Sequence, residues 1–243
     1  MISRCLLHGF TGSSKSWEFL ADPTALAPTL VGHAGARDEA LAVDGFEAEV
    51  ERLAALLPST SAVHAVGYSL GARLALGLAL RHPERVARLT LLSGHPGLES
   101  DAERAARRAS DAAWCELLLR EGLAAFVDAW QAQPLWASQA TLAPRLLAHK
   151  LRERLSHNAE GLCRSLRLTG LAEMPNYRER LRELGMPVTL VAGELDPKFC
   201  DLARDMAGRL RHVQLEIVPG AGHDLLLERP EFVSELIQRG DRP

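Results

Sequence analysis

The stretch Gly67-Tyr68-Ser69-Leu70-Gly71 decides the fold because of what stands on either side of it. An apolar run at Ala62–Val66, typical of a buried β-strand, precedes it, and an apolar-periodic helical pattern at Leu70–His82 follows. A G-x-S-x-G sequence between a strand and a helix is a nucleophile elbow. Its glycines allow a sharp turn, so that the hydroxyl of Ser69 projects from the edge of a sheet. We therefore predict that Ser69 is catalytic rather than part of a structural glycine turn.

Short β-type apolar runs alternate with longer helical patterns on both sides of this turn. The predicted strands are Ile2–Leu7, Pro28–Val31, Ala62–Val66, Val86–Leu92, Pro187–Ala192 and Val213–Val218. The predicted helices are Phe46–Leu57, Leu70–His82, Lys198–Leu210 and Pro230–Gln238. This alternation indicates an α/β fold in which helices flank a mostly parallel sheet.

One long interval breaks the alternation. Residues 99–185 show only helical pattern, rich in Ala, Leu and Arg. We predict a helical cap at 99–185, inserted into a core formed by residues 1–98 and 186–243. Because ligands of open α/β sheets bind outside the carboxyl ends of the strands, such a cap would roof the site. The alternative is a few extra surface helices.

A serine needs a histidine to activate it, and the histidine needs an acid to orient it. After an elbow serine the chain order is acid, then histidine. Asp196 follows the predicted strand at 187–192, and His223 follows the strand at 213–218 on a glycine-rich loop. Both strand ends meet Ser69 at one edge of a parallel sheet. Glu194, on the same loop as Asp196, is the competing acid.

An oxyanion hole formed by two backbone N–H groups completes such a site. Leu70 directly follows the serine, and Phe10 stands in the loop after the first strand, so we predict these two donors. The other histidines without a partner pattern are expected to be structural or solvated: His33, His64, His82, His149, His157 and His212.

Composition excludes several classes of function. The 243 residues contain 28 Lys+Arg and 31 Asp+Glu, a formal charge of −3, which favours neither nucleic acid nor an anionic membrane as a partner. No apolar run approaches the ~18 residues of a membrane span, and no signal-peptide pattern is visible. The four cysteines form no CxxC pair, and no metal-binding motif occurs. We expect a cytoplasmic protein with free thiols and no metal.

Arginines give a second signal. Arg73 stands four residues after Ser69, one helical turn along, and can face the same side. Three more arginines lie within residues 103–108, and Arg152 and Arg154 follow in the predicted cap. Guanidinium groups suit the bidentate binding of carboxylates. The alternative, a solvated helix face, is the commoner role of an arginine-rich helix.

Several stretches carry a resemblance to a known family. They are Leu7-His8-Gly9-Phe10-Thr11-Gly12-Ser13, Gly67-Tyr68-Ser69-Leu70-Gly71-Ala72-Arg73, Gly94-His95-Pro96-Gly97-Leu98, Arg107-Arg108-Ala109-Ser110-Asp111 and Gly193-Glu194-Leu195-Asp196-Pro197-Lys198-Phe199. With His223, they resemble the α/β-hydrolase superfamily over nearly the whole chain. Within it they look like the 2-succinyl-6-hydroxy-2,4-cyclohexadiene-1-carboxylate synthases of menaquinone biosynthesis. The elbow alone is not specific to that branch, whereas the combination of the stretches at 94–98, 107–111 and 193–199 is considerably more specific.

The resemblance implies a carbon–oxygen lyase without metal or organic cofactor. It would eliminate pyruvate from 2-succinyl-5-enolpyruvyl-6-hydroxy-3-cyclohexene-1-carboxylate. Ser69, activated by His223 and Asp196, would remove a ring proton. The N–H groups of Phe10 and Leu70 would hold the charge that moves onto the conjugated carbonyl.

The resemblance also implies how a small polycarboxylate is bound. By matched position, the substrate-binding residues would be Tyr68, Arg73, Arg107, Trp130 and Arg154. Three departures from the family pattern stand out. Thr29-Leu30-Val31-Gly32-His33-Ala34 lacks the usual acidic residue and proline, and Ala72 replaces a common glycine. The chain also begins at the strand that carries the oxyanion loop, which predicts a shortened N-terminal sheet edge.

Two other hypotheses stay open. A carboxylic-ester or thioester hydrolase would use the same triad through an acyl-enzyme, and a binding protein of this fold would be catalytically silent. A hydrolase needs an apolar acyl pocket, whereas the synthase needs convergent arginines. A silent protein usually lacks a triad member. The sequence does not indicate an oligomeric state.

Overall fold

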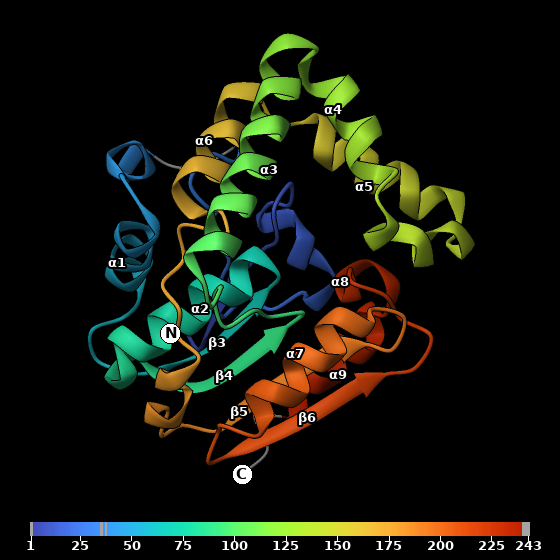
Figure 1. Ribbon diagram of the computed structural model, residues 1–243. Coiled ribbons are helices and arrows are strands. Elements are labelled where there is room, and N and C mark those ends of the chain that lie inside the picture. The colour runs from blue at the N-terminus through green and yellow to red at the C-terminus, as the bar shows by residue number, and fades with distance from the viewer. Residues whose placement is uncertain (1, 35, 37, 240–243) are drawn as a thin grey trace.

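The computed structural model describes residues 2–34, 36 and 38–239, and its centre is one six-stranded sheet (Figure 1). The strand order is β2-β1-β3-β4-β5-β6, and each neighbouring pair is parallel. The strands are β1 (Arg4–Leu7), β2 (Ala25–Leu26), β3 (Val63–Tyr68), β4 (Val86–Leu92), β5 (Val188–Gly193) and β6 (Val213–Val218). Parallel pairing brings all carboxyl ends to one edge, where the candidate residues follow their strands.

Alternating side chains along the strands build two apolar layers. Leu7 of β1 and Leu190 of β5 belong to the cluster that contains α1 (Phe46–Leu56), α2 (Leu70–Arg81) and α7 (Pro197–Ala207). Their neighbours Leu6 and Val191 belong to a second cluster. This cluster contains the 3₁₀ helix η1 (Ser14–Leu20) and helices α8 (Leu225–Glu228) and α9 (Pro230–Arg239). Because successive residues of a strand point to opposite faces, each face of the sheet packs against its own set of helices.

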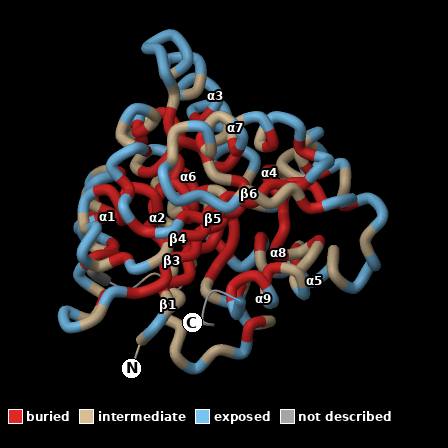
Figure 2. The backbone as a smooth tube through the Cα atoms, turned by 90° about the horizontal axis from the view of Figure 1, so that it is seen from below, coloured by how far each residue is buried: buried red, intermediate tan, exposed pale blue. Residues whose placement is uncertain are grey.

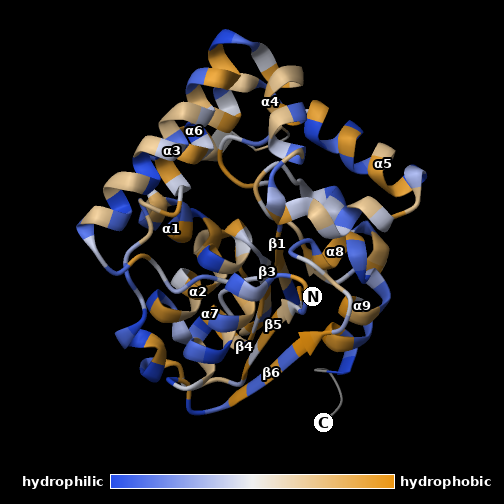
Figure 3. Ribbon diagram, turned by 45° about the vertical axis from the view of Figure 1, so that its right-hand side comes forward, coloured by the Kyte–Doolittle hydropathy of each residue, from blue (hydrophilic) through white to orange (hydrophobic). Residues whose placement is uncertain are grey.

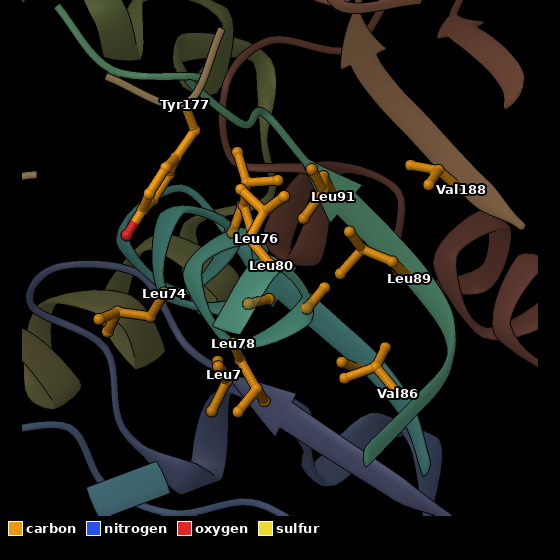
Figure 4. Close-up of a cluster of buried hydrophobic side chains, with 14 of the residues drawn as sticks. Leu7, Leu74, Leu76, Leu78, Leu80, Val86, Leu89, Leu91, Tyr177 and Val188 are labelled. Carbon is orange, nitrogen blue, oxygen red and sulfur yellow. The ribbon is translucent and has the colours of Figure 1, made fainter. Parts of the chain in front are cut away.

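Helix α2 forms the centre of the larger cluster. Every residue from Leu70 to Leu80 is buried, as expected for a helix that is hydrophobic all round. Its leucines pack with Leu89 and Leu91 of β4 and with Val188 of β5 (Figure 4). Complete burial of one such side chain contributes about 1.5–3 kcal/mol. The start of α2, which follows Ser69, is thus held by the core rather than by a surface loop (Figure 2).

The interval 99–185 contains no strand. It holds α3 (Asp101–Arg120), α4 (Gly122–Gln131), α5 (Pro144–Leu155) and α6 (Ala159–Thr169), with η4 (Pro134–Thr141) and η5 (Glu179–Glu183). Helices α3, α4 and α6 share their own apolar cluster. These helices lie above the sheet (Figure 1), and α5 alternates hydrophilic and hydrophobic positions (Figure 3). Within the described residues, no helix combines the length and apolarity that crossing a membrane requires.

The prediction of a strand at Pro28–Val31 is wrong. The strand at this edge is β2, the two residues Ala25–Leu26. The backbone N–H of Leu30 donates to Nε2 of buried His8 at 3.1 Å, and that of Val31 donates to a Glu49 carboxylate oxygen at 3.0 Å. Side chains therefore take the donors that a sheet ladder would use, and proline at 28 has none to offer. The remaining predicted strands and the four predicted helices are present, with ends shifted by a few residues.

The short helices η2 (Asp38–Ala42) and η3 (Pro83–Arg85) complete the elements of the described chain.

Candidate active site

The turn around Ser69 is a strained elbow between β3 and α2. Ser69 has φ 53° and ψ −105°, a region that side-chain-bearing residues rarely adopt. A Cβ at Gly67 would lie 2.2 Å from the carbonyl oxygen of Gly71, and one at Gly71 would lie 2.0 Å from that of Leu7. The Ser69 N–H donates to Leu92 O at 2.9 Å, which ties the turn to β4. Only glycine fits at both flanking positions of this turn.

Ser69, His223 and Asp196 form a continuous hydrogen-bonded chain. Nε2 of His223 lies 3.0 Å from Ser69 Oγ, and Nδ1 lies 2.7 Å from an Asp196 carboxylate oxygen. Asp196 and His223 are 6% and 2% exposed, so little water competes for these contacts. The His223 carbonyl accepts from Ser93 Oγ at 2.9 Å, which anchors its loop to the end of β4. This geometry lets the imidazole take a proton from the serine.

The two candidate acids have different partners. Asp196 is the N-cap of α7 and accepts from the Phe199 N–H with one oxygen while the other faces His223. Glu194 is exposed and accepts from the Gly220 N–H at 2.9 Å. The structure therefore places Asp196, and not Glu194, against the histidine.

Phe10 and Leu70, the predicted oxyanion donors, lie in the loop after β1 and at the start of α2. Leu70 is the first residue of α2, and the first N–H groups of a helix have no partner inside that helix. Both residues line one cavity with Ser69. The backbone at the start of α2 thus offers a donor beside the serine, which is where an oxyanion would form.

A cavity of about 310 Å³ lies between the strand ends and the helices of 99–185. Its aromatic wall consists of Phe10, Tyr68, Trp114, Trp130, Trp136 and Phe199. The ring centroid of Trp136 lies 5.6 Å from that of His223. The sequence predicted Tyr68 and Trp130 as lining residues, and the structure places both in this wall. Trp114 and Trp136 also face the cavity.

Cations line this cavity, and acids do not. Its charged lining residues are Arg73, Arg107 and Lys198, with no carboxylate among the described residues of the wall. Arg73 is 9% exposed and donates to Thr169 O of α6 at 2.8 Å. Burial, and then the charge of Arg107, lower the pKa of Arg73 to about 9, so it stays charged at neutral pH. Two neighbouring positive charges favour an anionic ligand.

Arg107 is partly neutralised. Its Nε donates to Asp111 at 2.9 Å, one turn along α3. Burial raises the pKa of Asp111 despite that charge. The Arg107 side chain is one-third exposed and keeps other N–H donors for a ligand.

Arg154, predicted to contact substrate, is not among the residues that line the cavity. It is 1% exposed and lies behind Trp136, with its guanidinium carbon 5.1 Å from the ring centroid. Its Nε and one terminal nitrogen have no hydrogen-bond partner in the described chain. Arg154 thus carries unused donors one side chain away from the cavity wall.

Three other buried histidines have backbone partners. The N–H groups of Leu30, Thr11 and Ala34 donate to His8, His33 and His157 respectively. Burial lowers the pKa of all three imidazoles. Neutral, bonded rings of this kind hold the loop after β1 in place.

Helix α5 contacts this same loop through Glu153. One carboxylate oxygen accepts from Ser13 Oγ at 2.8 Å and from Ser16 Oγ at 2.7 Å. The other accepts from Lys150 at 3.0 Å, and Lys150 lies 3.6 Å from Asp224, the residue after His223. Helix α5 therefore bridges the Phe10 loop and the His223 loop.

His95 and Lys198 line the cavity but were not predicted as site residues. Both stand within motifs of the family resemblance, His95 in the loop after the carboxyl end of β4 and Lys198 in the first turn of α7, which follows the carboxyl end of β5. That shared strand-end position is the signal that could have identified them. Within the described chain, no group of three or more His, Cys, Asp or Glu side chains is arranged to hold a metal ion.

Comparison with known proteins gives consistent matches. The 2-succinyl-6-hydroxy-2,4-cyclohexadiene-1-carboxylate synthase of Enterobacter sp. (strain 638) is 37% identical, covering 94% of this chain and 87% of that protein. The synthase of Salmonella agona (strain SL483) is 35% identical, covering 95% and 90%. A solved structure of MenH from S. aureus superposes with a TM-score of 0.92 at 27% identity, covering 98% and 92%.

A thermophilic esterase from Thermogutta terrifontis shares the fold alone, with a TM-score of 0.80 at 24% identity and coverage of 99% and 89%. The family model described as "Alpha/beta hydrolase family" matches residues 6–236. The resemblance predicted from the sequence motifs is confirmed. With its parallel sheet, elbow serine and matched length, this chain belongs to the α/β-hydrolase family.

Proposed function

We propose that this protein is a 2-succinyl-6-hydroxy-2,4-cyclohexadiene-1-carboxylate synthase of menaquinone biosynthesis, a carbon–oxygen lyase. It eliminates pyruvate from 2-succinyl-5-enolpyruvyl-6-hydroxy-3-cyclohexene-1-carboxylate. The observation that carries this proposal is a hydrogen-bonded Ser69–His223–Asp196 chain opening into a cavity lined by cations and no carboxylate. A tricarboxylate substrate matches that charge, whereas a simple ester leaves it unused.

The reaction begins with proton removal. His223 accepts the Ser69 proton, and Asp196 stabilises the imidazolium that forms. Ser69 Oγ then takes the ring proton next to the succinyl carbonyl. The negative charge moves onto that carbonyl oxygen, where the N–H groups of Phe10 and Leu70 hold it.

Elimination then proceeds by a shift of double bonds within the substrate ring. Electrons from ring carbon 2 form a double bond to carbon 3, and the original 3,4 double bond moves to carbons 4 and 5. The bond between carbon 5 and the enolpyruvyl oxygen breaks, and the pyruvate enolate leaves. It gains one proton at its methylene carbon while the ring has lost one, so no water is consumed.

Arg73 and Arg107 bind substrate carboxylates in this proposal, and Tyr68 and Trp130 pack against the ring. Arg154 has donors without a hydrogen-bond partner directly behind Trp136, which supports a substrate-binding role beside the same site. Residues 99–185 act as a cap over the core formed by 1–98 and 186–243. A cytoplasmic location fits the four free, buried cysteines.

Pyruvate release tests the proposal directly. Purified protein mixed with the enolpyruvyl substrate should produce pyruvate, detected by coupling to lactate dehydrogenase and NADH. Catalytic release at micromolar substrate supports the synthase. Absence of pyruvate, combined with ester or thioester cleavage, contradicts it in favour of the hydrolase hypothesis.

We expect no covalent intermediate on Ser69 during this turnover. A lyase uses the serine as a base, whereas an ester or thioester hydrolase accumulates an acyl group on it. Intact-mass measurement after millisecond quenching should show only the unmodified chain. A transient adduct on Ser69 with the natural substrate would contradict proton abstraction by this residue.

Replacing Arg73 or Arg107 with alanine should lower kcat/KM for elimination by 10- to 150-fold. Loss of a charge-assisted partner costs about 1.5–3 kcal/mol. Lysine at either position should restore activity only in part, because ammonium lacks the planar fork. The matched control is Arg108→Ala, because Arg108 is exposed on α3 and pairs with Glu173 at 2.8 Å.

Any background cleavage of a small neutral ester should persist in these variants. Arg154→Ala should act in the same direction on elimination. Equal losses for the neutral ester and the tricarboxylate would show that the arginines maintain the fold instead of binding carboxylates.

A further inference from the structure

The imidazole of His95 is a fixed hydrogen-bond donor at the cavity wall. Its Nδ1 accepts from the Gly97 N–H at 3.0 Å. A neutral ring that accepts at Nδ1 carries its proton on Nε2. Nε2 has no hydrogen-bond partner among the described residues, and the ring is 7% exposed. His95 therefore keeps one oriented N–H for a ligand.

The surroundings of His95 keep it neutral. Burial, followed by the charges of Arg73, Lys198, Arg178 and Arg107, lowers its pKa to about 3. Arg178 is itself paired, since it lies 3.0 Å from Glu99. The imidazole thus stands among cations without adding a charge of its own.

Lys198, like Arg73, lines the cavity without an ion pair to a carboxylate among the described residues. It lies in the first turn of α7, two residues after Asp196, and its side chain is exposed. Its Nζ lies 5.9 Å from the ring centroid of Phe199, which packs 4.4 Å from the ring of His223. No ion pair joins Lys198 to a carboxylate within the residues that the structure describes.

We propose that Nε2–H of His95 and Nζ of Lys198 form a subsite that holds one carboxylate of the substrate. This inference rests on the proposed function and assigns the third carboxylate, beside those bound by Arg73 and Arg107. Both residues also line an adjoining hollow, whose other charged lining residues are Arg178 and the acids Glu99, Glu103, Asp201 and Asp205. The carboxylate is therefore expected on the side of the main cavity, where no acid of the described chain lines the wall. Because the Lys198 side chain is exposed, the bound carboxylate remains partly hydrated, and the subsite is assigned to substrate affinity rather than to the chemical step.

The first test replaces Lys198 with methionine. KM for the tricarboxylate should rise about tenfold with kcat within twofold, because an interaction equal in ground and transition states changes KM alone. Lys198→Arg should retain most of the affinity. Lys15→Met removes the same charge from an exposed position in η1 and should leave both constants unchanged.

The second test separates a ligand-binding role of His95 through Nε2 from a structural role through its Nδ1 contact with Gly97. Asparagine can place an oxygen near Nδ1 and keep the Gly97 contact, but it does not reach the Nε2 position. Glutamine reaches the Nε2 position and can donate there, but it does not preserve the Nδ1 contact. The proposal expects His95→Asn to raise KM about tenfold and His95→Gln to stay close to wild type. The reverse order, with parallel changes in melting temperature, overturns it.

Two further outcomes are decisive. If the unmodified protein releases pyruvate while Lys198→Met and His95→Asn keep its KM, the subsite is wrong and the proposed function stands. If the unmodified protein releases none, the proposed function fails. Binding is then measured by quenching of tryptophan fluorescence, since Trp114, Trp130 and Trp136 line the cavity. Equal affinity of Ser69→Ala and Ser69→Ala/Lys198→Met for the tricarboxylate overturns the subsite.

Discussion

Ser69→Ala should lower the rate of pyruvate release by about 10⁴–10⁶-fold, the range found when a triad serine is removed. Without Oγ, His223 has no group through which to take the ring proton, and its Nε2 loses its 3.0 Å contact. The cavity and its cations remain, so KM should change little. A coupled pyruvate assay at high enzyme concentration can follow so slow a rate.

Stability separates this effect from misfolding. Alanine keeps the Cβ of Ser69, and the removed hydroxyl faces the cavity, so the free energy of unfolding should change by less than about 0.5 kcal/mol. Ser234→Ala in α9, remote from the cavity, serves as the control for the loss of one hydroxyl. Rapid pyruvate release by a correctly folded Ser69→Ala protein would contradict the mechanism.

Gly71→Ala should lower the free energy of unfolding by about 3 kcal/mol. A Cβ at this position would lie 2.0 Å from Leu7 O and 2.7 Å from His8 O, so α2 would have to move away from β1. Intrinsic helix propensity favours alanine by about 1 kcal/mol, so a net loss measures the steric clash. Urea denaturation followed by circular dichroism gives this value.

The same displacement should reduce elimination, because β1 leads into the loop that carries Phe10. Gly185→Ala is the matched control, since a Cβ there meets nothing within 4 Å. A Gly71→Ala protein as stable as the Gly185→Ala protein would show that the elbow tolerates a wider spacing than the structure has.

Much of the core could be predicted from sequence because strands, turns and helix periods are local patterns. The elbow at Ser69 needs a strand, a glycine turn and a helix in succession, and the patterns of all three occupy consecutive residues. Asp196 follows the apolar run of β5, which is buried, and His223 follows the alternating run of β6, which is largely half-buried or exposed. Parallel pairing then brings these distant positions to one edge.

Other features depend on contacts that local patterns do not contain. The strand expected at Pro28–Val31 fails because His8 and Glu49 bind its N–H groups from elsewhere in the chain. Arg154 stands behind Trp136 because of how α5 packs, which no arginine spacing indicates. His95 and Lys198 line the same cavity only because β4 and β5 pair in the sheet, so the proposed carboxylate subsite could not be predicted from either local sequence.

The hydrogen bonds of Glu153 to Ser13 and Ser16 limit which segments of this enzyme can be replaced independently. The proposed cap, residues 99–185, is a continuous segment of the chain and could be exchanged for the corresponding part of a relative. Yet Glu153 accepts from Ser13 and Ser16, which lie outside this segment, and Arg73, also outside it, donates to Thr169 within it. Exchange of this segment would leave a buried carboxylate or guanidinium without its partner unless the partner residues on both sides were exchanged with it. Evolution of new specificity in this chain is therefore expected to proceed by paired substitutions across that boundary.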